Sequence, residues 1–368
     1  MGLNPITRRR LLTGAGLTSA TLAASALLAA CGSNDNKSSS GSAAAAGAGD
    51  FPSTPKYKFV FVCHVTTNSF FTPTQYGAQD ACALLNTEFQ WTGSKDAVVA
   101  EMVNATNTAI SAKADGIALA VVDKAAFNAP VNQALDAGIP VVSYNADGAK
   151  GDPGTNRLAY IGQGLYESGL ALGQRALDAG LASGDVVGFI ATPGALNIQP
   201  RIDGASDAIK QSGKPIKFTP VGTNADVVKG ASIIDAYAQG HPNLTGMLAV
   251  DAGSTEALGK TVAKYKLRDK SLKVAGGFDL NPGTLTAVKA GNLDYTIDQQ
   301  PYLQGFLPVL YLYLYKLSGG LIAPPETNTG LLFVTKENVD PYLQTKTRFE
   351  GSSTQQQVVQ RSGAIAHA

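Results

Sequence analysis

The sequence predicts an α/β protein made of two lobes, each built on a doubly wound parallel sheet. Apolar runs typical of buried strands alternate with helical periodicity along most of the chain. Once the polar ends are set aside, roughly 300 residues remain, a length that favours two domains over one hydrophobic core. The composition, with 40 glycines and 44% hydrophobic residues, suits helices packed closely on sheets.

The first half of the folded region has a βαβαβαβ pattern. Its first strand is expected at 58–63, where the continuous apolar run is typical of a strand buried on both faces. Gly138 should close the third helix as a residue with positive φ. Further strands are expected at 89–91, 117–122 and 139–144. Helical spacing marks the segments between them: Tyr76, Gly77, Ala81, Leu84 and Leu85; Val99, Val103, Thr106 and Ile110; Phe127, Val131, Ala134 and Leu135.

The second half repeats this plan. Strands are expected at 186–190, 217–221, 247–250, 272–278 and 295–298. Asn281 and Pro282 form a good helix start, with Asn as the cap and Pro in the first position, and Gly291 should end that helix. A long amphipathic helix follows at Phe306, Val309, Leu310, Tyr313 and Leu317. Because parallel sheets bind ligands beyond the carboxyl ends of their strands, polar residues at those ends are the candidate site.

The N-terminus predicts export. Thr7-Arg8-Arg9-Arg10-Leu11-Leu12 precedes an apolar run and resembles a twin-arginine signal. Leu28-Ala29-Ala30-Cys31 resembles a bacterial lipobox, in which Cys31 is acylated and becomes the first mature residue. The alternative is an uncleaved membrane anchor at 11–30, although several Gly, Ser and Thr residues weaken such a span. We expect cleavage at Cys31 and a lipid-anchored protein that faces the periplasm or the cell exterior.

Low-complexity segments flank the folded region. Residues 31–55 are rich in Gly, Ser and Ala and should form a flexible linker after the signal peptide at 1–30. Residues 346–368 form a polar tail.

Charge and cysteine content exclude several classes. The chain has 29 Lys and Arg against 28 Asp and Glu, so no basic excess indicates nucleic acid. Cys63 and Cys82 could form a disulfide outside the cell or remain free buried thiols. No phosphate loop, metal-binding cluster or nucleophile motif is present in the sequence, which predicts no enzyme, no metal and no cofactor.

The predicted strand ends carry side chains suited to a small, neutral, polyhydroxylated ligand. Amides, carboxylates and a guanidinium can fix hydroxyl groups, and an aromatic pair offers an apolar face to a sugar ring. These residues are His64, Asn68, Phe70 and Phe71 after the first strand, Asn145 after the fourth, and Arg201, Asp251, Asp279 and Gln299 in the second half.

Six short segments follow one another in a characteristic order and spacing: Asn68-Ser69-Phe70-Phe71, Ala114-Asp115-Gly116-Ile117, Ala137-Gly138-Ile139-Pro140-Val141-Val142, Arg201-Ile202-Asp203-Gly204, Gly277-Phe278-Asp279 and Gln299-Gln300-Pro301. On these segments, the chain from about residue 56 to 340 resembles the periplasmic sugar-binding proteins of ABC importers, of the ribose-binding type. The resemblance implies the type I periplasmic binding protein fold and sugar contacts by His64, Asn68, Phe70, Phe71, Asn145, Arg201, Asp279 and Gln299.

The chain departs from the ribose binders at several of these positions. His64 replaces a small hydroxyl residue, Asn145 replaces Asp, Ala146 replaces a second Arg, and the 251–254 loop is longer. Another monosaccharide or a polyol is therefore as consistent with the sequence as ribose.

Several site residues also have structural interpretations. Phe70 and Phe71 could be core residues, Asp279 could cap the helix that starts near Asn281, and Arg201 could pair with Asp203 on the surface. His64 could equally be a hydrogen-bonded structural histidine, and Trp91 is typical of core.

The resemblance implies hinged capture of the ligand between an N-terminal lobe (56–161 and 300–329) and a C-terminal lobe (162–299 and 330–345). Three crossings near 161–164, 299–301 and 330 should join them. The expected partners are a monosaccharide or polyol and the membrane permease, with the chain as a monomer. The alternative is a receptor component that binds a sugar or autoinducer and docks on a sensor. A repressor with this core fold is excluded because an export signal stands in place of a DNA-binding head.

Overall fold

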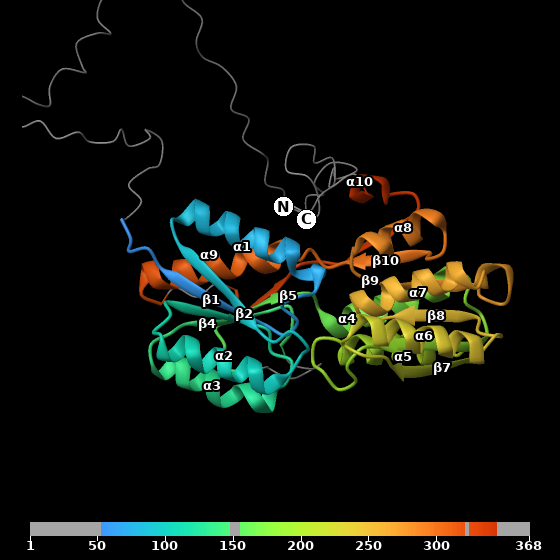
Figure 1. Cartoon of the computed structure of the whole chain (residues 1–368), viewed down its shortest axis with the longest axis horizontal. Coiled ribbons are helices and arrows are strands. Elements are labelled where there is room, and N and C mark those ends of the chain that lie inside the picture. Colours follow the sequence, from blue (N-terminus) through green and yellow to red (C-terminus); the bar gives the residue numbers. More distant parts are fainter. Residues whose placement is uncertain (1–52, 148–154, 321–323, 344–368) are drawn as a thin grey trace, which may run out of the picture. The chain divides into compact units, whose positions relative to one another are not determined.

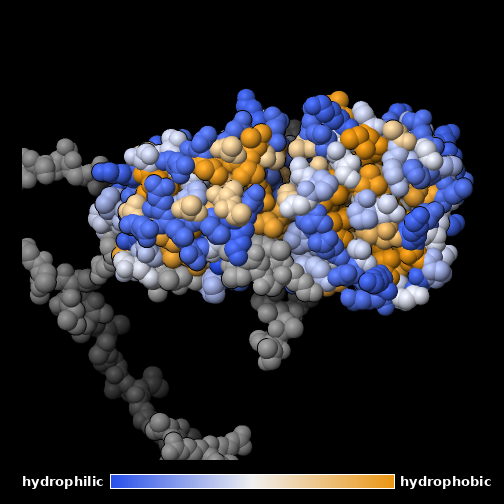
Figure 2. Space-filling view, turned by 90° about the horizontal axis from the view of Figure 1, so that it is seen from below, coloured by the Kyte–Doolittle hydropathy of each residue, from blue (hydrophilic) through white to orange (hydrophobic). Residues whose placement is uncertain are grey.

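The computed structural model describes residues 53–147, 155–320 and 324–343. The expected signal peptide, the expected acylation site Cys31, nearly all of the linker and the tail lie outside these residues. Within the described residues, no helix is both long enough and apolar enough to cross a membrane. The face seen in Figure 2 mixes hydrophilic side chains with smaller hydrophobic patches.

The N-terminal lobe is built on a parallel sheet with the strand order β11-β5-β4-β3-β1-β2. The strands are β1 (Lys58–Cys63), β2 (Glu88–Gly93), β3 (Gly116–Leu119), β4 (Val141–Tyr144), β5 (Ala159–Gly162) and β11 (Glu326–Asn328). The helices are η1 (Ser69–Phe71), α1 (Thr72–Leu85), α2 (Val99–Ser111), α3 (Lys124–Asp136) and α9 (Leu303–Ser318). Helices α1 and α9 lie together on one side of this sheet, and α2 and α3 lie on the other (Figure 1).

The C-terminal lobe repeats the design with the strand order β12-β10-β9-β8-β6-β7, in which only β12 is antiparallel. Its strands are β6 (Gly184–Ile190), β7 (Ile216–Gly222), β8 (Gly246–Ala249), β9 (Val274–Phe278), β10 (Tyr295–Asp298) and β12 (Leu332–Thr335). Its helices are α4 (Leu165–Asp178), α5 (Gln199–Gln211), α6 (Val227–Gly240), α7 (Ala252–Lys264), η2 (Leu267–Asp269), α8 (Pro282–Ala290) and α10 (Asp340–Leu343).

The chain passes between the two sheets at three places. It leaves β5 for α4, returns from β10 to α9, and leaves β11 for β12. These connections include Gln163, Gln299 and Gly330, close to the positions that the sequence indicated. The predicted fold class, two doubly wound lobes with a three-crossing hinge, is therefore confirmed.

Local sequence signals account for most element boundaries. Gly291 ends α8 with a φ of +78°, and Asn281 is the N-cap of the same helix with Pro282 in its first turn. The strand expected at 117–122 is shorter, because its pairing with β4 ends at Leu119 and the chain then turns into α3 at its cap, Asp123. The strands β5, β11 and β12 were missed.

The hydrophobic cores lie on the faces of the two sheets. In the N-terminal lobe, β1 is almost wholly inaccessible and packs with β2, β3 and α2. Cys63 and Cys82 are buried free thiols and do not form a disulfide with each other. Burial raises the pKa of the Cys63 thiol to about 12, which keeps it protonated and unreactive.

Candidate functional site

Polar side chains from both lobes meet at the carboxyl ends of the two sheets. His64 and Asn145 come from the N-terminal lobe, and Arg201, Asp279 and Gln299 come from the C-terminal lobe and the hinge. Each of these side chains is at most 7% exposed. Polar and charged groups are rarely buried to this degree unless they are paired or face a ligand. The lobes are therefore closed on this cluster.

Arg201 lies in the first turn of α5 and is 3% exposed. Its Nη1 donates to the carbonyl of Val250 at 3.1 Å, and its Nη2 donates to Oε1 of Gln163 at 3.1 Å. The guanidinium lies 4.2 Å from the centroid of the Phe278 ring, a cation–π contact. Its Nε–H has no hydrogen-bond partner among the described residues. The surface interpretation of Arg201 is wrong, because the Asp203 carboxylate accepts its bond from Gln199 instead.

Asp279 connects β9 to the hinge. Its Oδ1 accepts a hydrogen bond of 2.6 Å from Nε2 of Gln299. Burial raises the pKa of Asp279 to about 6, while the positive charge of Arg201 opposes that shift. Asp279 does not cap α8, since the N-cap is Asn281.

Gln299 and Asn145 continue the network across the hinge. Nδ2 of Asn145 donates to Oε1 of Gln304 at 3.0 Å and to Oε1 of Gln299 at 3.5 Å. Asn145 and Asp279 both adopt positive φ, at 63° and 74°. Such backbone conformations are uncommon outside glycine and cluster at binding sites. These hydrogen bonds fix the orientation of the Asn145, Gln299 and Asp279 side chains.

His64 follows β1 and lies edge-on to Phe71, with ring centroids 5.3 Å apart. Its Nε2 is 3.2 Å from Nδ2 of Asn197, which belongs to the opposite lobe, and its Nδ1 has no partner among the described residues. Burial, with a further contribution from Arg201, lowers the pKa of His64 to about 4. The imidazole is therefore neutral near pH 7, and its Nε2 accepts the bond from the Asn197 amide.

The aromatic pair divides between two environments. Phe71 is 1% exposed and packs against Trp91, with ring centroids 5.8 Å apart, inside the core of the N-terminal lobe. Phe70 instead lines a cavity between the lobes. Asn68 accepts a hydrogen bond from the backbone N–H of Phe70 and so caps η1. Ligand contacts by Asn68, Phe70 and Phe71 stay predictions.

Asp251 is the N-cap of α7. One carboxylate oxygen accepts from the backbone of Ser254 at 2.8 Å, and the other accepts from the backbone of Ala191 at 3.0 Å. Both oxygens thus have structural partners, and a ligand contact by Asp251 also stays a prediction.

Sequence reasoning missed several residues of the cluster. Gln163 follows the unrecognised strand β5, and it bonds Arg201 and the carbonyl of Gly330 at 3.1 Å each. Gln304 and Thr329 complete the hinge network around Gln299. Only recognition of β5 and β11 as strands would have marked Gln163 and Thr329 as residues at strand ends.

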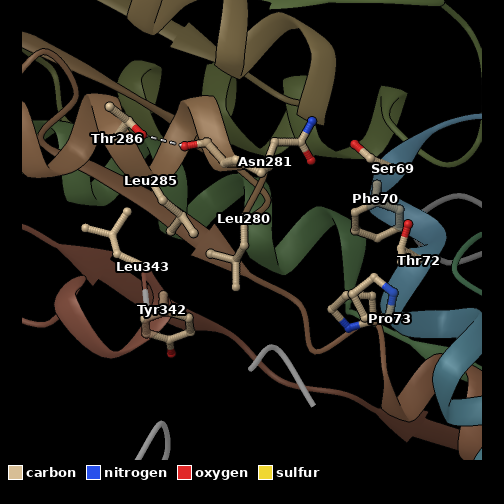
Figure 3. A pocket seen from close by; sticks show the side chains of 12 residues that line it. Ser69, Phe70, Thr72, Pro73, Leu280, Asn281, Leu285, Thr286, Tyr342 and Leu343 are labelled. Atoms are coloured by element: carbon tan, nitrogen blue, oxygen red, sulfur yellow. Dashed lines mark hydrogen bonds between the residues drawn. The ribbon is translucent and has the colours of Figure 1, made fainter. Parts of the chain in front are cut away.

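Two cavities flank the cluster. One of about 480 Å³ is largely apolar and runs between the lobes, as Figure 3 shows with Phe70 on one side and Leu280 and Leu285 on the other. The second, of about 460 Å³, is lined by His64 and by segments at 122–125 and 192–197. No group of metal-ligating side chains occurs among the residues that the structure describes.

Comparisons with known proteins agree with this architecture. Residues 59–319 match the family described as "Periplasmic binding protein domain". The chain is 47% identical over 315 residues to the "Xylose/arabinose-binding protein XylF" of Sulfolobus acidocaldarius. The aligned region covers 83% of this chain and 77% of that protein.

Solved structures give the same picture. A carbohydrate transporter protein from Acidothermus cellulolyticus, in complex with myo-inositol, has 27% identity and a TM-score of 0.68, covering 78% of this chain and 97% of that chain. A solute-binding protein from Burkholderia graminis, in complex with D-arabinose, has 25% identity and a TM-score of 0.71, covering 79% of this chain and 99% of that chain. The family binds sugars and is not a family of enzymes, as the sequence predicted. The chain belongs to the periplasmic sugar-binding proteins of the ribose-binding type.

Proposed function

We propose that this protein captures a monosaccharide of the pentose class, such as xylose or arabinose, and delivers it to an ABC permease. The observation that carries this proposal is the buried cluster in which Arg201 Nε and His64 Nδ1 lack partners among the described residues. Buried polar groups are almost always hydrogen-bonded, so these two indicate groups that a ligand would supply. The pentoses named for XylF and for the solved relative support the class.

The charge of the cluster favours a neutral ligand. Burial lowers the pKa of Arg201, and the negative charges of Asp279 and Asp251 oppose that shift. Arg201 and Asp279 carry opposite charges, so a ligand without a net charge can contact both without adding an unpaired charge to a buried site. Hydroxyl groups can both donate and accept, so one sugar can meet an Arg, a His and an Asp together.

Hinge closure is the proposed mechanism. The ligand contacts must come from both lobes, because a ligand shifts an open–closed equilibrium only by its differential affinity for the closed state. His64 and Asn145 would hold the sugar from one lobe, and Arg201 and Asp279 from the other. The permease would then bind the closed form.

The location of the protein is part of the proposal. Export through the twin-arginine signal and acylation at Cys31 would place the folded lobes outside the cytoplasmic membrane, on a linker of residues 31–55. The alternative is a receptor component that binds the sugar and docks on a sensor. In that case the protein would bind sugar, but deletion of its gene would leave sugar uptake by the cells unchanged.

Calorimetric titration with D-xylose, L-arabinose, D-arabinose, D-ribose and myo-inositol tests the proposal. We expect micromolar or tighter binding of at least one pentose and a higher melting temperature at saturation, because a ligand that binds only the native state stabilises it. Absence of binding by all the pentoses would overturn the assignment, and binding of myo-inositol alone would replace it with a polyol.

A further inference from the structure

The segment between β6 and α5, residues 191–198, belongs to the C-terminal lobe by connectivity but contacts the N-terminal lobe. The backbone N–H of Leu196 donates to the carbonyl of Val122 at 3.0 Å. Nδ2 of Asn197 lies 3.2 Å from Nε2 of His64. The side chain of Leu196 also packs against the core of the N-terminal lobe. This short segment therefore makes backbone, side-chain and apolar contacts with the opposite lobe.

The segment is held in shape by its own lobe. Asp251 accepts a hydrogen bond from the backbone of Ala191, at the point where the segment begins. Oε1 of Gln199, at the start of α5, accepts a bond of 2.7 Å from the backbone of Gly194. Gly194 has a φ of +86°, which a residue with a side chain rarely adopts. Because the segment is fixed at both ends, little conformational entropy is lost when it meets the other lobe.

Because the segment and its partners belong to different lobes, we take these contacts to break when the lobes open. They therefore stabilise the closed state by an amount that does not depend on the sugar. The apparent affinity for a ligand decreases when a smaller fraction of the protein is in the binding-competent state. A contact that changes this fraction therefore changes the affinity for every ligand by the same factor.

We infer that Leu196 and Asn197 form a clasp, a pair of positioning residues that hold the lobes closed over the sugar without touching it. This inference rests on the proposed function. The clasp predicts a slower release of every bound sugar and an unchanged preference among sugars.

The test compares the full chain with the variants Leu196→Ala and Asn197→Ala, titrated with each sugar that the wild type binds. Loss of one interlobe hydrogen bond or apolar contact should weaken the binding of each sugar by about 3- to 10-fold. In Leu196→Ala, which leaves the hydrogen bond between Asn197 and His64 in place, the ratio of Kd values between two sugars should stay constant, and the change should lie in the dissociation rate. Leu84→Ala and Asn243→Ala are matched controls, since both residues are exposed and lie outside the interlobe contacts.

A Kd that stays at the wild-type value, or a loss confined to one sugar, would overturn the clasp. If the wild type binds none of the sugars, the proposed function fails, and small-angle scattering of the ligand-free full chain then decides. The clasp requires a larger radius of gyration in the Leu196→Ala, Asn197→Ala double variant than in the wild type. Equal radii would overturn it.

Discussion

The Asp279 carboxylate accepts a 2.6 Å hydrogen bond from the amide of Gln299, which ties the end of β9 to the hinge connection that follows β10. Burial lowers the pKa of the Arg201 guanidinium, and the negative charge of the same carboxylate opposes that shift. Asp279 thus links the end of β9 to the hinge and interacts with Arg201.

Replacement of Asp279 should abolish most binding. In Asp279→Ala, the ligand hydroxyls lose a buried charged partner, which should cost about 2–4 kcal/mol, or roughly 30- to 1,000-fold in affinity. Titration calorimetry measures this loss, with exposed Asp269→Ala as the control. The melting temperature of the ligand-free protein should change little. A large fall in that temperature with nearly unchanged affinity would assign Asp279 a structural role instead.

Replacement of His64 should change how stability depends on pH. The pKa of His64 falls from 6.5 in the unfolded chain to about 4 in the folded protein. Between these values the unfolded state binds more protons, so this group makes stability rise with pH from about 4 to 6.5. Asp279 has the opposite effect, since its pKa rises from 3.8 to about 6 and stability falls with pH over that range.

The comparison of wild type with His64→Gln isolates the histidine. Urea unfolding at pH 4.5 and at pH 7 should show that the wild type loses more stability on acidification than the variant does. Asp279→Asn serves as the opposite control, because it should increase the loss of stability between pH 7 and pH 4.5. Equal losses in wild type and His64→Gln would mean that His64 is protonated in the folded protein at pH 4.5.

A close contact between helices α4 and α5 positions Arg201. A Cβ added at Gly169 would lie 2.2 Å from the carbonyl oxygen of Arg201, so Gly169→Ala must displace the start of α5. Such overpacking typically costs about 1–3 kcal/mol. We expect lower stability in thermal unfolding together with weaker sugar binding. Gly240→Ala is the control, because a Cβ there meets no atom within 4 Å.

The lipid anchor can be tested apart from ligand binding. Cys31→Ala should release the protein from the membrane fraction, because acylation of that thiol is the proposed tether. Fractionation and immunoblotting of cells measure this. An uncleaved variant that remains in the membrane would show that residues 11–30 form a spanning anchor.

The sequence by itself determined the fold class and most elements. Apolar runs and helical spacing are local properties, and residues such as Asn281 and Gly291 set helix ends through their own backbone preferences. The strand-end rule then brought His64, Asn145, Arg201, Asp279 and Gln299 to one place, and all of them are buried there.

Only the tertiary structure decided which partners these side chains take. His64 and Asn197 are 133 positions apart, and Asn145 and Gln299 are 154 apart, so no local pattern links them. Asp251 and Asp279 both follow strands, yet one caps a helix while the other bonds the hinge. The difference arises because hydrogen-bond partners depend on how the two lobes meet, and periodicity along the chain carries no information about that geometry.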